Sequence, residues 1–300
     1  MKQLYKYILI IVVSFTAVVY PSSGQNVNVH VVTKTIDKDF PITTEQLLSI
    51  KGEKSKINIK GWNNNYVKLR LKLISKNINR EKAEEDLRGI HYEIKGLKKE
   101  VIALSNYYVD SNIESILQVE YEILIPNNVS LEIKNLYGQV HVVDLKSYLN
   151  LEVNFGQVFL NNLKGEIILK SKYADITANN INTSFKIISE KADIELTNIS
   201  GSYQFNCNYG MVSLESLNKV KRIQINAKNM EVNLMLDRFE QYNYNLSTTY
   251  NKVKIPIKYQ SEGGSKNKYI KLFKQGNSEI SITTTFSPII IQSTKLAISK

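Results

Sequence analysis

The sequence is poor in cysteine, with one, Cys207, among its 300 residues. A single cysteine excludes a disulfide within the chain, and its position far from the N-terminus excludes a lipid-modified N-terminal cysteine. The sequence has only 3 histidines, His30, His91 and His141, which are isolated from one another and from cysteines or carboxylates at metal-ligand spacing. It therefore does not predict a zinc site.

Motifs of common catalytic folds are missing as well. The chain contains no G-x-S-x-G nucleophile elbow, no phosphate-binding glycine loop and no dinucleotide-binding fingerprint. It also lacks the regular threonine column that ice binding would need. These absences favour a protein that is not an enzyme and that carries no cofactor.

The charge is positive but scattered. The formal net charge is +11, and it comes mostly from lysines spread along the whole chain rather than from a block interleaved with aromatics. Nucleic-acid binding needs a clustered basic footprint, so we expect no nucleic-acid partner. A basic surface attracts anionic polysaccharides or lipid head groups without specificity.

The first residues predict a secretory signal peptide over residues 1–24. A basic start, MKQLYK, precedes the apolar run YILIIVVSFTAVVY and then the small residues of PSSGQ. The apolar run is shorter than the roughly 20 residues that span a bilayer. We expect cleavage near Gly24-Gln25, no integral membrane segment afterwards, and a location in the periplasm, at the cell surface or outside the cell.

A short motif repeats at a fixed spacing in the middle of the chain. An aromatic or long side chain precedes a small residue at intervals of 18 in five copies. The copies are Tyr137-Gly138, Phe155-Gly156, Tyr173-Ala174, Lys191-Ala192 and Tyr209-Gly210. The next candidates, Lys228-Asn229 and Tyr250-Asn251, drift to spacings of 19 and 22. A constant spacing of this kind indicates a repeat architecture.

Within each copy the apolar residues alternate, change phase at the motif and alternate again. Period two predicts strands, and the phase change predicts a corner. Because one hairpin is marginal in water, the copies must stack to share a core. We therefore predict an all-β fold, a single-stranded β-solenoid (β-helix) of about 18-residue coils. The left-handed helix of hexapeptide acyltransferases is excluded, since steps of six from Leu151 reach Gln157 and Asp175.

Polar residues mark the opposite corner of each coil. Asn and Asp tolerate a left-handed backbone and form local hydrogen bonds at turns, and glycine relieves crowding at the aromatic corner. We interpret both corners as structural. The predicted turn ladder is Asp144, Asn162, Asn180, Asn198 and Ser216.

Four segments follow from this pattern. Residues 1–24 are the signal peptide, 25–125 a β-rich N-terminal cap region with a short helix near 80–88, 126–236 the solenoid repeats, and 237–300 irregular C-terminal coils and a cap. Caps are needed because terminal coils expose core and strand edges.

The stretches LLSIKGEKSKINIKGWNNNYVKLRLKL and VEYEILIPNNVSLEIKNLYGQVHV, separated by the acidic helix and followed by the repeats, resemble the bacterial DUF4097 family. The likeness runs from about Thr44 to Ile257. It implies an exported, repetitive β-protein with no catalytic residues to carry over. The adhesin role associated with the family is itself inferred from shape.

Two kinds of chemical site compete with a structural interpretation. Cys207 shares an inward column with Val153 and Ser171, so it is a buried small residue or, alternatively, a reactive nucleophile, which would need exposure. The carboxylates Asp175 and Asp193 occupy the same position in adjacent coils. With Glu195 they are candidates for a Ca²⁺ site or a catalytic pair of a polysaccharide-active β-helix enzyme.

An outward polar face suits an extended glycan or an envelope protein as partner, or it is simply a soluble surface. Its predicted residues are Asn150, Glu152, Asn154, Lys170, Lys172, Lys186, Gln204, Asn206 and Asn208. We therefore expect an exported, non-enzymatic adhesin or envelope interaction module. The alternatives are the polysaccharide-active enzyme and a structural envelope protein that self-associates end to end. Ligand identity, handedness and oligomeric state stay open.

Overall fold

The computed structural model describes residues 28–97, 101–109, 112–259, 269–272 and 278–294. Within these ranges the chain is all-β apart from one α-helix and two short 3-10 turns, which confirms the predicted class. The predicted signal peptide lies outside the described residues.

In chain order the elements are β1 (His30–Pro41), β2 (Leu47–Glu53), β3 (Ser55–Trp62), β4 (Tyr66–Asn77), α1 (Arg80–Leu87), β5 (Ile90–Leu97), β6 (Val101–Tyr108), β7 (Ile116–Pro126), β8 (Ser130–Val143), β9 (Leu149–Leu236), η1 (Phe239–Gln241), β10 (Tyr242–Thr249), β11 (Val253–Lys254), η2 (Ile257–Tyr259), β12 (Tyr269–Leu272), β13 (Ser278–Thr285) and β14 (Ile289–Ser293).

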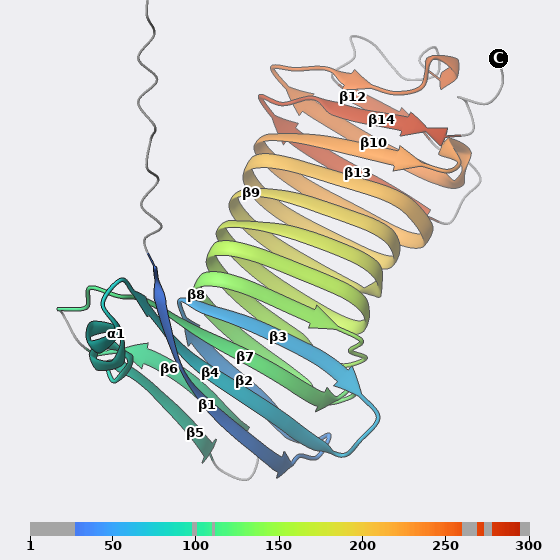
Figure 1. Cartoon of the computed structure of the whole chain (residues 1–300). Helices are drawn as coiled ribbons and strands as arrows, with labels where there is room; N and C mark the ends of the chain where they lie inside the picture. The colour runs from blue at the N-terminus through green and yellow to red at the C-terminus, as the bar shows by residue number, and fades with distance from the viewer. Residues whose placement is uncertain (1–27, 98–100, 110–111, 260–268, 273–277, 295–300) are drawn as a thin grey trace, which may run out of the picture.

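The long element β9 winds through successive coils that stack along one axis (Figure 1). Its start pairs in parallel with β8, and the paired residues differ by 18 positions throughout, from Leu131 with Leu149 to Val143 with Asn161. Parallel strands in constant register place like residues of consecutive coils one above another, about 4.8 Å apart.

Each coil consists of two extended runs joined at the corners. Alternate residues point inward in both runs and are buried in one continuous hydrophobic core. The outward residues therefore form two opposite faces of the solenoid. The first face is formed by residues 149–154, 167–172, 185–190 and 203–208, and the second face by residues 157–161, 175–179, 193–197 and 211–215.

The N-terminal strands continue both layers of the solenoid. β2 pairs in parallel with the first part of β8, and β3 with the second part. β7 lies between β3 and β4, while β1 pairs with β4. Behind these strands the buried amide oxygen of Asn106 accepts hydrogen bonds from the hydroxyls of Ser55 and Tyr121, each at 2.9 Å. These bonds join three strands at the base of the first coil.

The helix α1 begins at Asn79, whose side-chain oxygen accepts hydrogen bonds from the backbone N–H groups of Glu81 and Lys82 at 2.8 and 3.2 Å. This is the N-cap arrangement that satisfies free donors at a helix start. In the described part of the chain no helix has the length and apolar character needed to cross a membrane.

The C-terminal strands add to the last coil of β9. β13 and β14 each pair with it in parallel, for example Thr283 with Asn226 and Ile291 with Leu234. β10 then pairs in parallel with β13, and β12 pairs antiparallel with β10. Strands from the end of the sequence thus extend the same two layers.

The corner spacing changes after Tyr209, and the sequence pattern placed the next corner one residue too early. The next corner residue is Asn229, with φ of 51°, rather than Lys228. The preceding turn contains an additional left-handed residue, Lys219, with φ of 56°. Two extra residues between the buried Leu217 and Ile223 lengthen this turn and shift the next corner.

Candidate functional site

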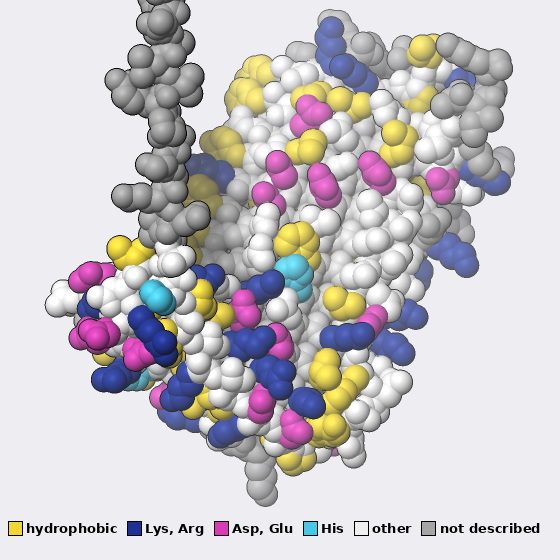
Figure 2. Space-filling model, viewed as in Figure 1, with side chains coloured by type: hydrophobic (Ala, Val, Ile, Leu, Met, Phe, Trp, Pro, Cys, Tyr) yellow, Lys and Arg dark blue, Asp and Glu magenta, His cyan; other side chains and the backbone are white. Residues whose placement is uncertain are grey.

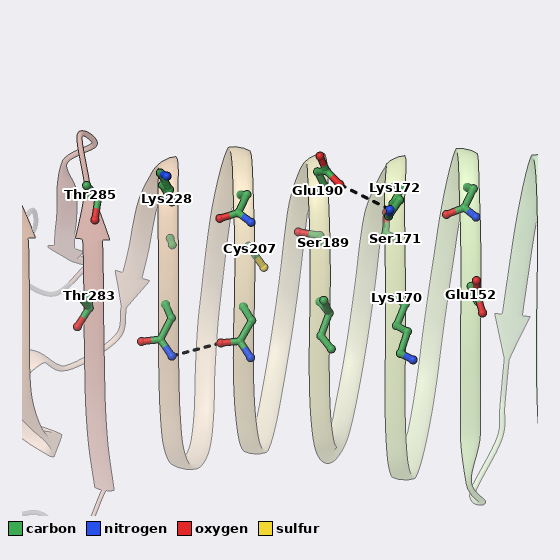
Figure 3. Close-up of a pocket in the computed structure, with 16 residues that line it drawn as sticks. Glu152, Lys170, Ser171, Lys172, Ser189, Glu190, Cys207, Lys228, Thr283 and Thr285 are labelled. Atoms are coloured by element: carbon green, nitrogen blue, oxygen red, sulfur yellow. Dashed lines mark hydrogen bonds and ion pairs between the residues drawn. The ribbon is translucent and has the colours of Figure 1, made fainter.

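A groove of 690 Å³ crosses the first face of the solenoid (Figure 3). Most of its lining side chains are outward residues of neighbouring parallel strands, and the strands run across the length of the groove. The lining consists of Glu152, Asn154, Lys170, Ser171, Lys172, Ile188, Ser189, Glu190, Asn206, Cys207, Asn208, Asn226, Ala227, Lys228, Thr283 and Thr285.

The strand register aligns the outward residues of the groove in columns. Thr283 pairs with Asn226, and Thr285 with Lys228, so β13 completes the array that β9 begins. The amide of Asn226 donates to the side-chain oxygen of Asn206 at 3.2 Å, which links two adjacent coils. The floor is therefore a regular set of amides and hydroxyls, each able to bond a further partner.

Charged side chains share these columns with the amides and hydroxyls. Lys172 lies 3.9 Å from Glu190, and Glu152 lies 3.8 Å from Lys134 of β8. Lys170 and Lys228 have no ion pair with any residue that the structure describes. Lysines thus provide two unpaired positive charges, one towards each end of the groove.

Cys207 lies behind the floor in the buried inward column with Ser171 and Ser189. Only 2% of its surface is exposed, and burial raises the pKa of its thiol to about 11. A thiol in this state is protonated at neutral pH and reacts slowly. The buried interpretation of Cys207 therefore accounts for its environment.

The predicted polar face overlaps with the groove only in part. Glu152, Asn154, Lys170, Lys172, Asn206 and Asn208 line it, whereas Asn150, Lys186 and Gln204 do not. Sequence reasoning missed Ile188, an apolar residue within a polar set, and it missed Asn226 and Lys228, which follow the irregular turn. It also missed Thr283 and Thr285, because no 18-residue spacing connects them to the coils. The one available signal was the alternation of isoleucine with polar residues in EISIT, residues 279–283, which predicts a strand.

The turn positions have the left-handed backbone expected of Asn and Asp. Their φ values are 62° at Asp144, 53° at Asn162, 56° at Asn180, 53° at Asn198 and 53° at Ser216. Asn162 donates to Asp144 at 2.6 Å. Asn180 and Asn198 donate instead to Asn161 and Asn179, one position earlier in the preceding coil. Side-chain amides therefore connect successive turns.

The aromatic corner forms an exposed stack along the solenoid. Tyr137, Phe155 and Tyr173 stack with ring centroids 5.0 Å apart in each pair, and the Lys191 ammonium lies 4.9 Å from the Tyr173 ring centroid. A hydrogen bond to the Tyr173 hydroxyl raises the pKa of Lys191. Tyr209 continues the corner with the same left-handed backbone, φ 61°. Since ring faces are covered by neighbouring rings, the stack offers edges rather than flat surfaces to a ligand.

The candidate carboxylates lie on the second face, away from the groove. Asp175 accepts a hydrogen bond from the backbone N–H of Asp193 at 2.9 Å. Among the described residues, no three His, Cys, Asp or Glu side chains form a group that could hold a metal ion. Figure 2 shows Asp and Glu side chains in a row across the coils of the face in view.

We expect calcium to have no effect on stability. With at most two carboxylates converging near Asp175 and Asp193, the site lacks the six to eight oxygen ligands that Ca²⁺ takes. For the native chain, the Tm measured with millimolar calcium should equal the Tm measured with chelator. The same should hold within Asp175→Ala. A calcium-dependent rise in Tm that Asp175→Ala abolishes would establish the metal site instead.

Comparison with known proteins gives one matching family and several solved structures of low sequence identity. The family model described as Toastrack DUF4097 matches residues 18–287. A crystal structure of a "putative cell adhesion protein" from Clostridium sporogenes shares 15% identity, covering 87% of this chain and 100% of that one, with a TM-score of 0.24. A "putative adhesin" from Bacteroides fragilis shares 9% identity over 86% of this chain and 97% of its own, with a TM-score of 0.35.

A "putative lipid binding protein" from Parabacteroides distasonis shares 9% identity over 86% of this chain and 96% of its own, with a TM-score of 0.33. No curated protein matches the sequence significantly. At these identities no ligand and no residue role carries over to this chain.

Proposed function

This chain belongs to the Toastrack DUF4097 family, and from that premise we propose that it is an exported, non-enzymatic β-solenoid that acts as an adhesin-like interaction module. Residues 1–24 would direct export to the envelope or beyond. Residues 25–125 and 237–300 would cap coils of about 18 residues within 126–236. The groove on the first face would hold an extended glycan or a segment of an envelope protein.

The observation that carries this proposal is the shape and chemistry of the groove. It is lined mostly by polar side chains from several consecutive strands of one face. Rows of amides and hydroxyls can bond an extended partner at many points, each contributing modestly. Such a surface fits recognition of a repetitive chain better than enclosure of a small molecule.

The same side chains give little support to catalysis. The buried thiol of Cys207 is protonated at neutral pH, since burial raises its pKa to about 11. Glu190 and Glu152 each lie within 4 Å of a lysine, at 3.9 and 3.8 Å. Both carboxylates are therefore engaged in ion pairs, and the lining contains no further Asp or Glu side chain.

Binding of the purified chain to bacterial and host glycans, with envelope fractions in parallel, tests the proposal. We expect saturable binding that survives moderate salt and releases no product. Asn208→Trp places an indole in the groove and should weaken that binding at least about tenfold, because it blocks the floor. Thr177→Trp, an equivalent change at an exposed position of the second face, should leave it unchanged.

Three results would count against the proposal. Shortened oligosaccharides would identify an enzyme that cleaves polysaccharides. Equal loss of binding in both tryptophan variants would place the contact outside the groove. Absence of binding to every glycan and envelope fraction would favour the structural, self-associating role.

A further inference from the structure

We propose that the groove on the first face binds an acidic polysaccharide, a chain of uronic-acid sugars whose carboxylates contact Lys170 and Lys228. This inference rests on the proposed function, because it specifies the ligand of the same groove. It follows from three features of the lining: unpaired lysines, a floor of amides and hydroxyls, and the near absence of apolar anchors.

The cations of the groove are available for a ligand. Lys170 and Lys228 are exposed, and neither has an ion pair in the part of the chain that the structure describes. Lys172 is loosely held, since its ammonium lies 3.9 Å from the Glu190 carboxylate and its side chain is 65% exposed. Separate carboxylates along the ligand could accept charge-assisted hydrogen bonds from Lys170, Lys172 and Lys228.

Amides and hydroxyls suited to a sugar chain lie between the two lysines and, on β13, beyond Lys228. Asn206, Asn208 and Asn226 offer amide donors and acceptors, and Thr283 and Thr285 offer hydroxyls. Each amide can form several hydrogen bonds, and the Asn226 to Asn206 bond leaves most of that capacity unused. The strands repeat every 4.8 Å or so, which is close to the length of one sugar ring in an extended chain.

The lining is less suited to a protein or a lipid. Protein interfaces are anchored by aromatic and arginine side chains, and the groove contains neither. An acyl chain would need a continuous apolar channel, whereas Ile188 is the one large apolar side chain in the lining. Ile188, 37% exposed, can contact the apolar side of a single sugar ring.

The opposite face would repel the same ligand. The outward positions of its four coils contain Asp175, Asp193, Glu195 and Glu215 and no lysine or arginine. A polyanion is therefore attracted to the first face and repelled from the second, beyond what the net charge alone would produce. The distribution of charge thus selects one face of a protein that is basic overall.

Titration of the full chain with oligogalacturonate, and with a neutral glucan oligomer of the same length, tests the inference. We expect oligogalacturonate to bind at least about tenfold more tightly than the glucan, with an affinity that falls as salt rises. Lys170→Gln and Lys228→Gln should each weaken binding about threefold, and the double variant about tenfold. Lys164→Gln removes an exposed lysine outside the groove and serves as the matched control.

Glu190→Gln gives a test in the opposite direction. Removing this carboxylate frees Lys172 and lowers the negative charge in the groove, so oligogalacturonate should bind about threefold more tightly. A purely structural effect of the substitution would weaken binding or leave it unchanged, which would contradict the proposal.

Further outcomes separate this inference from the proposed function. Equal affinity for the neutral glucan, unaffected by the lysine variants, would overturn the acidic ligand and leave the glycan-binding groove intact. Equally tight binding of poly-glutamate or of vesicles containing an anionic phospholipid would show attraction to charge alone and overturn the inference. Failure to bind any glycan, with binding to an envelope protein fraction retained, would also overturn it.

Discussion

Gly210→Ala should destabilise the solenoid by about 4 kcal/mol, because two independent effects oppose a methyl group at this corner. The residue has φ of 122°, a conformation that L side chains rarely adopt. An added Cβ would also lie 2.2 Å from the backbone oxygen of Ala192 in the preceding coil. Backbone in a stacked coil cannot move away without breaking the parallel pairing on which the coil depends.

The neighbouring coil supplies the control for this variant. Ala192 occupies the equivalent corner position, is buried, and is not among the residues with a positive φ. Ala192→Gly should therefore cost only about 1 kcal/mol, through lost packing and greater freedom of the unfolded chain. Urea denaturation of both variants measures the difference, and similar losses in the two would contradict the argument from corner geometry.

Phe205→Ala should cost about 3–5 kcal/mol, because it empties the centre of the core where the coils are stacked. The Phe205 side chain is fully buried, at 0% exposure, between the two runs of its coil. A coil contacts only its neighbours, so the rest of the solenoid has little means to fill the cavity. We expect amide hydrogen exchange to accelerate most in the coils on either side.

Gln204 provides the matched position for Phe205. It precedes Phe205 on the same strand but points outward and is exposed. Gln204→Ala should change the free energy of unfolding by less than about 0.5 kcal/mol. If Phe205→Ala and Gln204→Ala had the same effect, the inward and outward assignment of this strand would be wrong.

The sequence predicted the all-β class and the corner positions because both depend on local patterns. The spacing of Tyr137, Phe155 and Tyr173 is visible without knowledge of any contact, and their φ values of 61°, 57° and 54° show one repeated backbone conformation. The pattern failed at Asn229, where two extra residues in the preceding turn break the spacing. Insertions within a turn leave no periodic signal.

The site was harder to predict because it combines distant segments. Thr283 lies beside Asn226 only because β13 pairs with the last coil of β9. That pairing depends on long-range contacts, to which a residue pattern is insensitive. By contrast, Lys170 and Asn206 were predicted, since they occupy outward positions within the regular repeats.

The constant register of the coils has a consequence for how such a chain changes length in evolution. Leu131 pairs with Leu149, and the same shift applies along the whole of β8. Loss or duplication of one complete repeat would rejoin corner to corner and inward residue to inward residue, without altering the strands at either end. Because the groove is built from successive coils, the same event would shorten or extend the surface offered to a partner in unit steps.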